Sequence, residues 1–216
     1  MGINQLQEEI KQLNQNETDE QKKIARQAMS ISLDGVKILI SRYLDIVKEQ
    51  LKLANQDRKA DLIRIIDSLE NVCHFGARNL FDAIQLFILL WQVMCLEQAP
   101  NPFAFSVGNA DRIFEPYRQK ENLSREETAC LLKHFLVFFN VGSRSWAISQ
   151  NILISGKDND DNDLTNLTSY ALLDAYFDMN LPQPILSVKL HKNTPDQLYQ
   201  ELGKFFFTPG VLTFIE

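Results

Sequence analysis

Glycine is scarce in this sequence, and so are the other signs of a nucleotide-binding or nucleic-acid-binding protein. Only 8 of the 216 residues are glycine, against a usual share of about 7%, so a glycine-rich phosphate loop is not expected. The chain carries 22 Lys and Arg against 28 Asp and Glu, a net charge of −6. Nucleic-acid binders usually carry a basic patch, and none is visible. We therefore expect no nucleic-acid partner.

Cysteine and histidine are also few. The three cysteines, Cys73, Cys95 and Cys130, lie far apart in the sequence. An odd number of isolated cysteines argues against a disulfide framework and favours a reducing compartment. The three histidines lie in no metal-ligand spacing, so we expect no metal site.

Signals for secretion and membrane insertion are missing as well. The N-terminus is polar and acidic, unlike a signal peptide. The most apolar run, Ile84 to Leu96, is interrupted by Gln92 and is shorter than the about 20 residues that a membrane span needs. We expect a cytoplasmic protein with no membrane contact, in which this run is a buried helix.

Helical periodicity fills the first 98 residues. Apolar residues recur at helical spacing in four stretches: 3–13, a long one from Thr18 to Lys52, 62–69, and 81–98. Thr18 with Gln21 has the form of a capping box and predicts the start of the long helix. The stretch 81–98 is apolar almost all round, as in a helix buried on most sides.

From residue 99 onwards, strands alternate with helices. Short apolar runs at 103–108, 146–155, 185–190 and 211–215 read as strands. Helices are expected after the capping box Ser124–Glu127, over 164–178, and from an N-cap at Thr194 to about Phe207. Helix-length crossovers imply parallel strands. The sequence therefore predicts a predominantly helical α/β fold, with a helical layer at 1–98 and a strand–helix portion at 99–216.

The last predicted strand ends one residue before Glu216. Parallel strands are normally covered on both faces by further elements, and about four strands are too few to close a barrel of ~8. We expect the sheet to be completed either by the long N-terminal helices or, preferably, by protein from elsewhere.

Few candidate site residues stand out, and each has a structural alternative. Ser106 and Asp111 follow a predicted strand, where open α/β sheets place ligand groups, but Asp111 could instead cap a helix. His191 could serve as an acid or base, or could bond a backbone carbonyl. The acidic run 158–163 begins like a calcium loop but offers Asp163 and Ser169 where an EF-hand needs Gly and Glu. A solvated loop is favoured there.

Several segments taken in order resemble the glycyl radical enzymes, the pyruvate formate-lyase and radical dehydratase superfamily. They run from about Ala28 to the C-terminus. The quoted segments are Ala77–Leu80 (ARNL), Ala83–Gln85 (AIQ), Ser106-x-Gly108-x-x-Asp111, Gln150–Ile152 (QNI), Asp163–Tyr170 (DLTNLTSY), Leu181–His191 (LPQPILSVKLH) and Asn193–Asp196 (NTPD).

The resemblance implies a ten-stranded β/α barrel enclosing two loops. One loop bears a cysteine that becomes a thiyl radical, and the other bears a glycyl radical in an Arg-Val-x-Gly setting. A radical S-adenosylmethionine activating enzyme installs that radical. Members are lyases, dehydratases and formate acetyltransferases of anaerobic metabolism. By the same resemblance, Ser106, Asp111 and Gln150 would contact a substrate.

Neither radical loop is found in residues 1–216, and no catalytic residue is assigned. The chain is therefore expected to form about half of the barrel with its helical layer, an incomplete pyruvate formate-lyase-like domain that binds no cofactor itself. It would need a companion C-terminal portion or a homo-oligomer. The sequence also departs from the dehydratase pattern at Phe103–Ala104 and Asn109. The alternative is a stand-alone half-barrel that binds a small molecule or a partner without catalysis.

Overall fold

The computed structural model of the protein describes residues 2–97, 106–140, 151–207 and 212–215. The chain divides into two compact units, Met1–Val93 and Met94–Glu216. The division into functional regions 1–98 and 99–216 stays a prediction. None of the described helices is long and apolar enough to cross a membrane.

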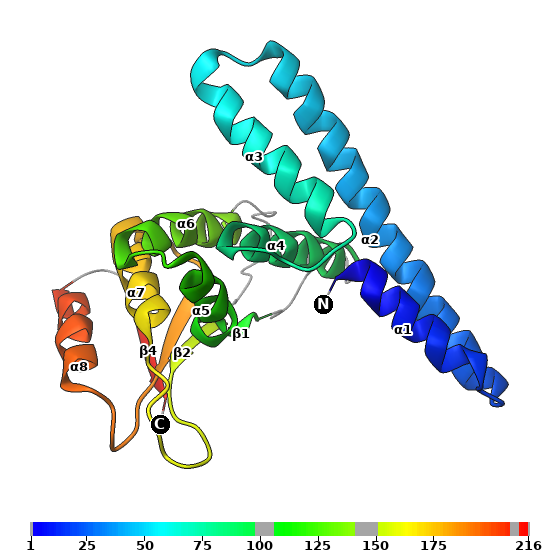
Figure 1. Ribbon diagram of the computed structural model, residues 1–216. Helices are drawn as coiled ribbons and strands as arrows, with labels where there is room; N and C mark the ends of the chain where they lie inside the picture. Colours follow the sequence, from blue (N-terminus) through cyan, green and yellow to red (C-terminus); the bar gives the residue numbers. More distant parts are fainter. Residues whose placement is uncertain (1, 98–105, 141–150, 208–211, 216) are drawn as a thin grey trace. The chain divides into compact units, whose positions relative to one another are not determined.

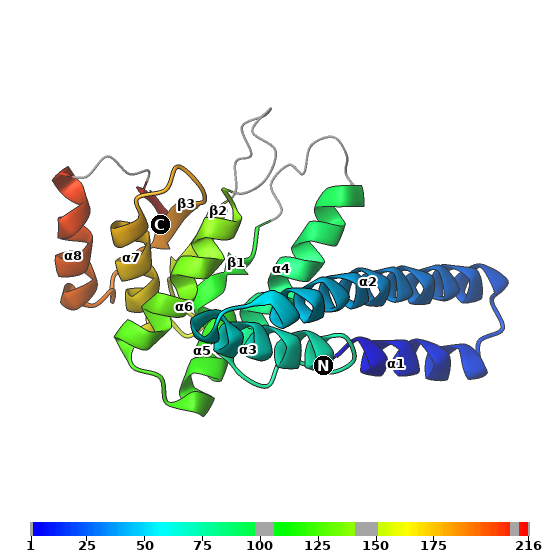
Figure 2. The same ribbon diagram turned by 90° about the horizontal axis from the view of Figure 1, so that it is seen from above.

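The first unit is built from helices alone. It contains α1 (Ile3–Gln15), α2 (Glu20–Leu53), α3 (Gln56–Val72) and most of α4 (Leu80–Glu97), which confirms the predicted helices. Both α1 and α3 lie along the same side of the long α2, as Figures 1 and 2 show. The helices share a core that includes Val36, Ile40, Leu69, Val72 and Leu89.

The start of α2 corrects the predicted cap. The N-cap is Asp19, whose carboxylate accepts hydrogen bonds from the backbone N–H groups of Gln21 and Lys22. Thr18 lies one residue outside the cap. Asn55 caps α3 in the same way, by accepting from the Arg58 N–H at 3.0 Å. Side-chain oxygens of this kind satisfy donors that a helix start leaves unpaired.

The second unit holds a parallel sheet. Its strands are β1 (Gly108–Asn109), β2 (Asn151–Ser155), β3 (Ile185–Lys189) and β4 (Leu212–Ile215), in the spatial order β1-β2-β3-β4. Every neighbouring pair is parallel. Helices α5 (Ala110–Glu121) and α6 (Arg125–Phe138) connect β1 to β2, α7 (Leu167–Met179) connects β2 to β3, and α8 (Asp196–Leu202) with the 3-10 helix η1 (Gly203–Phe207) connects β3 to β4. The predicted parallel α/β architecture is confirmed.

The helix starts in this unit test three predictions. The capping box of Ser124 and Glu127 is present at α6. Asn166 forms a second box with Ser169 at α7, so the helix begins slightly later than predicted. The predicted Thr194 cap is wrong, because α8 begins after Pro195. The Thr194 hydroxyl instead accepts from the His191 N–H at 2.8 Å.

The sheet has two different faces. Figure 2 shows α5, α6 and α7 along one side of it. Ile152 and Ile154 of β2 and Leu186 and Val188 of β3 are at most 1% exposed, and they form the core with the helices. Side chains alternate between the faces of a strand. Asn151, Leu153 and Ser187 therefore belong to the second face, away from these helices.

Candidate functional site

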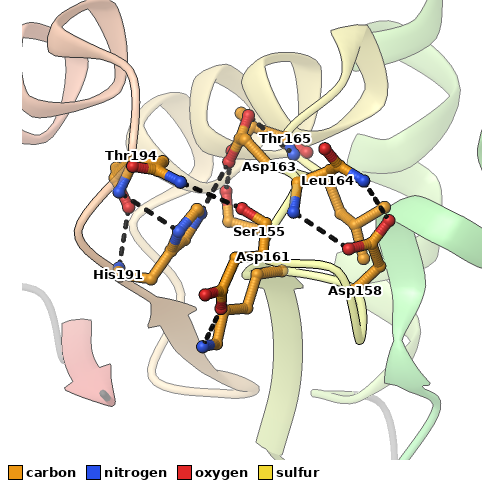
Figure 3. A network of polar contacts seen from close by, with 12 residues as sticks. Ser155, Asp158, Asp161, Asp163, Leu164, Thr165, His191 and Thr194 are labelled. Atoms are coloured by element: carbon orange, nitrogen blue, oxygen red, sulfur yellow. Dashed lines mark hydrogen bonds and ion pairs between the residues drawn. The ribbon is translucent and has the colours of Figure 1, made fainter.

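The carboxyl ends of β1, β2 and β3 meet at one edge of the sheet because the strands are parallel. Asp111, Ser155 and His191 lie at these three ends. Figure 3 shows part of the polar network that joins them to the loop before α7.

Asp111 is the most buried acid of the network, with no exposed surface. Its Oδ2 accepts from the Ser155 N–H at 2.6 Å and from the Ser169 hydroxyl at 2.7 Å. Its Oδ1 accepts from the Arg112 N–H at 2.8 Å. Burial raises the pKa of Asp111, and these hydrogen bonds oppose the rise. The carboxylate therefore joins α5 to the end of β2 and to the first turn of α7.

Glu115 lies one helical turn further along α5 and contacts the same turn of α7. Its Oε2 accepts from the Thr168 hydroxyl at 2.7 Å and from the Thr168 N–H at 3.2 Å. Burial alone would raise the pKa of Glu115, but the Arg118 guanidinium and the Thr168 hydroxyl outweigh it and hold the pKa below its usual value. Two acids thus stabilise the positive end of the α7 dipole.

Ser155 adopts an unusual backbone conformation where β2 ends. Its φ is 62° and that of Gly156 is 97°, a region that non-glycine residues rarely enter. The Ser155 hydroxyl bonds Thr165 Oγ1 at 2.7 Å, and its carbonyl accepts from Arg112 Nη2 at 3.0 Å. With the Asp111 bond to its N–H, every polar group of Ser155 is held, which fixes this conformation.

His191 bonds a carboxylate rather than the backbone carbonyl that its structural alternative required. Its Nε2 lies 3.1 Å from Asp163 Oδ1, and its Nδ1 accepts from the Asn193 N–H at 3.3 Å. Because Nδ1 accepts, the proton belongs on Nε2, which donates to Asp163. Asp163 also accepts from the Thr165 hydroxyl at 2.9 Å. The imidazole is thereby fixed in place between the end of β3 and the loop before α7 (Figure 3).

The acidic loop uses its carboxylates within the loop and on lysines. Asp158 accepts from the N–H groups of Asp160 and Asn162 at 2.8 and 2.9 Å. Asp161 pairs with Lys157 and with Lys192, and these two lysines lower the pKa of Asp161 to about 2. Within the described ranges, no group of His, Cys, Asp and Glu has the geometry of a metal site.

Ser106 lies at the opposite edge of the sheet from Asp111. Its hydroxyl donates to the carbonyl of Asn151, the first residue of β2, and accepts from the Gly108 N–H at 2.9 Å. Asp111 instead bonds Ser155, the last residue of β2. Four strand steps separate these two residues, which is about 13 Å. The structure therefore does not bring Ser106 and Asp111 together, and Gln150 lies outside the described residues.

Two amide oxygens on the sheet mark positions that sequence reasoning undervalued. Asn109 is in register with Leu153, and Leu153 with Ser187, so the three share the second face with Asn151. Among the described residues, Asn109 Oδ1 and Asn151 Oδ1 are buried side-chain acceptors without a hydrogen-bond partner. Buried acceptors of this kind are rare in native proteins. Each could accept a hydrogen bond from a ligand hydroxyl or ammonium group.

Comparison with known proteins identifies the family. A family model described as pyruvate formate lyase-like matches residues 1–214. The chain belongs to this family. This pyruvate formate lyase-like chain is 28% identical over 193 residues to the trans-4-hydroxy-L-proline dehydratase of Clostridioides difficile, and 24% identical over 198 residues to the isethionate sulfite-lyase of Bilophila wadsworthia. Each match covers 82% of this chain but only 24% and 23% of those proteins.

Solved structures agree on the fold of the pyruvate formate lyase-like chain. The glycerol-bound B12-independent glycerol dehydratase of Clostridium butyricum matches with a TM-score of 0.87 and 24% identity, over 94% of this chain and 28% of that one. A glycyl radical enzyme from Archaeoglobus fulgidus matches with a TM-score of 0.87 and 22% identity, over 99% and 30%. The resemblance to glycyl radical enzymes is confirmed, and the chain spans about a quarter of the length of its curated relatives.

Proposed function

We propose that this chain supplies the helical layer and about half of the ten-stranded barrel of a glycyl radical lyase or dehydratase that acts on a small polar metabolite. The strand order supports the half-barrel. Successive parallel strands lie side by side in chain order, and helices line one side of the sheet. A β/α barrel repeats this arrangement until it closes.

The observation that carries the substrate assignment is the pair of unpartnered amide oxygens on the second face of the sheet. In a β/α barrel the face away from the helices points inward. A hydroxyl or ammonium group of a substrate would satisfy Asn109 Oδ1 and Asn151 Oδ1, which otherwise remain buried at a cost. The relatives are named for glycerol, trans-4-hydroxy-L-proline and isethionate, which are all small and polar.

Ser106, which bonds the first residue of β2, stays a proposed substrate contact, and so does Gln150, which lies outside the described residues. Asp111 is also proposed from the family resemblance, but its geometry supports a positioning role, since its oxygens already bond three described donors. The two roles differ in what Asp111→Asn would change. Loss of a substrate contact lowers turnover alone, whereas loss of the Asp111 bonds lowers the melting temperature as well.

Residues 1–216 would not be catalytically competent alone. The sequence has no Arg-Val-x-Gly segment, and its cysteines have none of the neighbours found in the family's radical loop. A companion C-terminal portion would supply both radical residues, and a radical S-adenosylmethionine enzyme would install the glycyl radical. That radical supplies the hydrogen-abstraction chemistry, while this chain's residues bind and orient the substrate. An anaerobic, cytoplasmic setting is part of this proposal.

The test is activation of the complete assembly under anaerobic conditions. We expect a glycyl radical signal by electron paramagnetic resonance and turnover of glycerol, trans-4-hydroxy-L-proline, isethionate or a related compound. Residues 1–216 alone should show neither. Ser106→Ala and Asn151→Ala should lower turnover at least tenfold without changing the radical signal, whereas Gln200→Ala, on the exposed side of α8, should change nothing.

Two results would contradict the proposal. Turnover by residues 1–216 alone would show that the chain is competent. An assembly with no radical signal, combined with ligand-dependent stabilisation of residues 1–216 by a small polyol, would instead favour the stand-alone binding half-barrel.

A further inference from the structure

A pocket at the carboxyl end of β3 is lined by three lysines, and no acidic side chain of the described residues lines it. Its volume is about 760 Å³, within the range of small-molecule sites. The lining residues are Gly156 and Lys157 after β2, the run Lys189–Lys192 at the end of β3, and Tyr199 of α8. We call this space the lysine pocket.

The position of the lysine pocket in the sheet is one that ligands favour. In open α/β sheets, ligands bind outside the carboxyl ends of the strands. Ser155 at the end of β2 is in register with Lys189 at the end of β3, so the two strand ends lie side by side. Asn151 is at the other end of β2, four strand steps or about 13 Å away. A small ligand bound at Asn151 would therefore not reach the lysine pocket.

Lys189 brings an unpaired positive charge to the lysine pocket. Its side chain has no ion-pair or hydrogen-bond partner among the residues that the structure describes. The turn after β2 packs closely against it, because a Cβ at Gly156 would lie 3.1 Å from Lys189 Cβ and Cδ. The φ of Gly156 is 97°, which also favours glycine. The stem of Lys189 is therefore held in place while its charge has no counter-ion.

The other two lysines share one carboxylate. Asp161 pairs with Lys157 and, at 3.1 Å, with Lys192, so it fixes both side chains but balances only one of their charges. With Lys189, two positive charges remain in excess around the pocket. The other carboxylates of the 158–163 loop do not line it. A cleft lined by charges of one sign concentrates ions of the opposite sign.

The nearest acid on α5 is already opposed by a cation. A Cβ at Gly156 would lie 3.2 Å from Arg112 Nη2, and this nitrogen donates to the Ser155 carbonyl at 3.0 Å. The Arg112 guanidinium therefore lies directly behind the wall of the lysine pocket, where its charge opposes that of Asp111. Asp111 thus leaves the excess charge of the three lysines unbalanced.

We propose that the lysine pocket binds a small doubly charged oxyanion, such as inorganic phosphate or the phosphate group of a small metabolite. The two excess positive charges match the charge of such a group. Lysine ammonium groups bind phosphate oxygens through short, charge-assisted hydrogen bonds, and the Tyr199 hydroxyl adds a further donor. The proposal does not depend on the proposed radical function.

Isothermal titration calorimetry of residues 1–216 with inorganic phosphate tests the proposal. The titration is done at pH 8, where phosphate is close to doubly charged, and at constant ionic strength, because salt screens exposed charges. We expect saturable binding at one site, and a dissociation constant at least tenfold weaker for Lys189→Met. Lys192→Met, at a side chain that is 71% exposed, should also weaken binding and should not disturb the fold.

The matched control is Lys204→Met, which removes the same charge from the same unit outside the lysine pocket. It should leave the dissociation constant within twofold of the wild type. Sulfate should compete with phosphate, since it has the same charge and shape. Far-UV circular dichroism checks that each variant stays folded.

Three results would overturn the proposal. The first is the absence of saturable phosphate binding by the wild type. The second is equal binding by the wild type, Lys189→Met and Lys192→Met, which would place the anion elsewhere. The third is an equal heat from sodium chloride at the same ionic strength, which would show screening of surface charge instead of a site.

Discussion

At the scale of single residues, two acids on α5 should respond to pH in opposite directions. Asp111 and Glu115 both contact the first turn of α7, yet burial raises the pKa of Asp111 while the Arg118 and Thr168 bonds overcome burial and lower that of Glu115. A raised folded pKa means that protonation stabilises the fold, and a lowered one means the reverse.

The prediction compares each acid with its amide. The free energy of unfolding of the wild type, relative to Asp111→Asn, should rise as the pH falls from 7 towards 4. Relative to Glu115→Gln, the wild type should lose stability as the pH falls below about 4.5, the ordinary glutamate value. Urea unfolding at several pH values measures both differences. If the two differences in the free energy of unfolding changed with pH in the same direction, the contacts of Asp111 and Glu115 would not differ as the structure implies.

Residue spacing alone could not place the candidate site. Ser106 and Asp111 are five positions apart, and this spacing suggests that both face one pocket. However, β1 is only two residues long, and Asp111 already lies within α5. Their bonds to opposite ends of β2 decide their positions, and those bonds depend on pairing across more than 40 residues. The same holds for Asn109, whose face is set by its register with Leu153.

At the scale of helices and strands, local signals predicted most of the elements and their first residues less well, and α5 (Ala110–Glu121) was not among the predicted helices. Apolar periodicity and the Ser124–Glu127 capping box involve residues of one helix that are close together in the sequence. Such signals can therefore be recognised without knowledge of the tertiary structure. The cap at α2 was misplaced by one residue because Thr18 and Asp19 are both capable caps. At α8, the Thr194 hydroxyl bonds the His191 N–H instead, and that contact belongs to the turn after β3.

The position of the α2 N-cap at Asp19, rather than at Thr18, predicts which of two neighbouring substitutions destabilises α2. Asp19→Ala removes the acceptor used by the N–H groups of Gln21 and Lys22, and such a loss typically costs about 1 kcal/mol. Thr18→Ala leaves that cap intact and should change the free energy of unfolding by less than about 0.5 kcal/mol, as for other surface substitutions. Thermal and urea unfolding of both variants provide the comparison. A larger loss of stability for Thr18→Ala than for Asp19→Ala would show that Thr18 is the N-cap, as the sequence suggested.

At the scale of the whole molecule, each of the two compact units contains buried leucines of its own, which predicts local effects of core substitutions. Leu69 of α3 belongs to the helical core, and Leu132 of α6 is fully buried in the strand unit. Replacing a buried leucine by alanine typically costs about 2–5 kcal/mol. Each compact unit has its own apolar interior, so most of this cost should fall on the unit that contains the substitution.

Hydrogen exchange followed by mass spectrometry can locate that cost. Leu69→Ala should speed amide exchange in peptides from α2 and α3 by tenfold or more and leave those from β2, β3 and α7 within about twofold of the wild type. Leu132→Ala should give the opposite pattern. If either substitution sped exchange equally in both units, the chain would open as one cooperative body. The sheet would then depend on the helical layer for its stability.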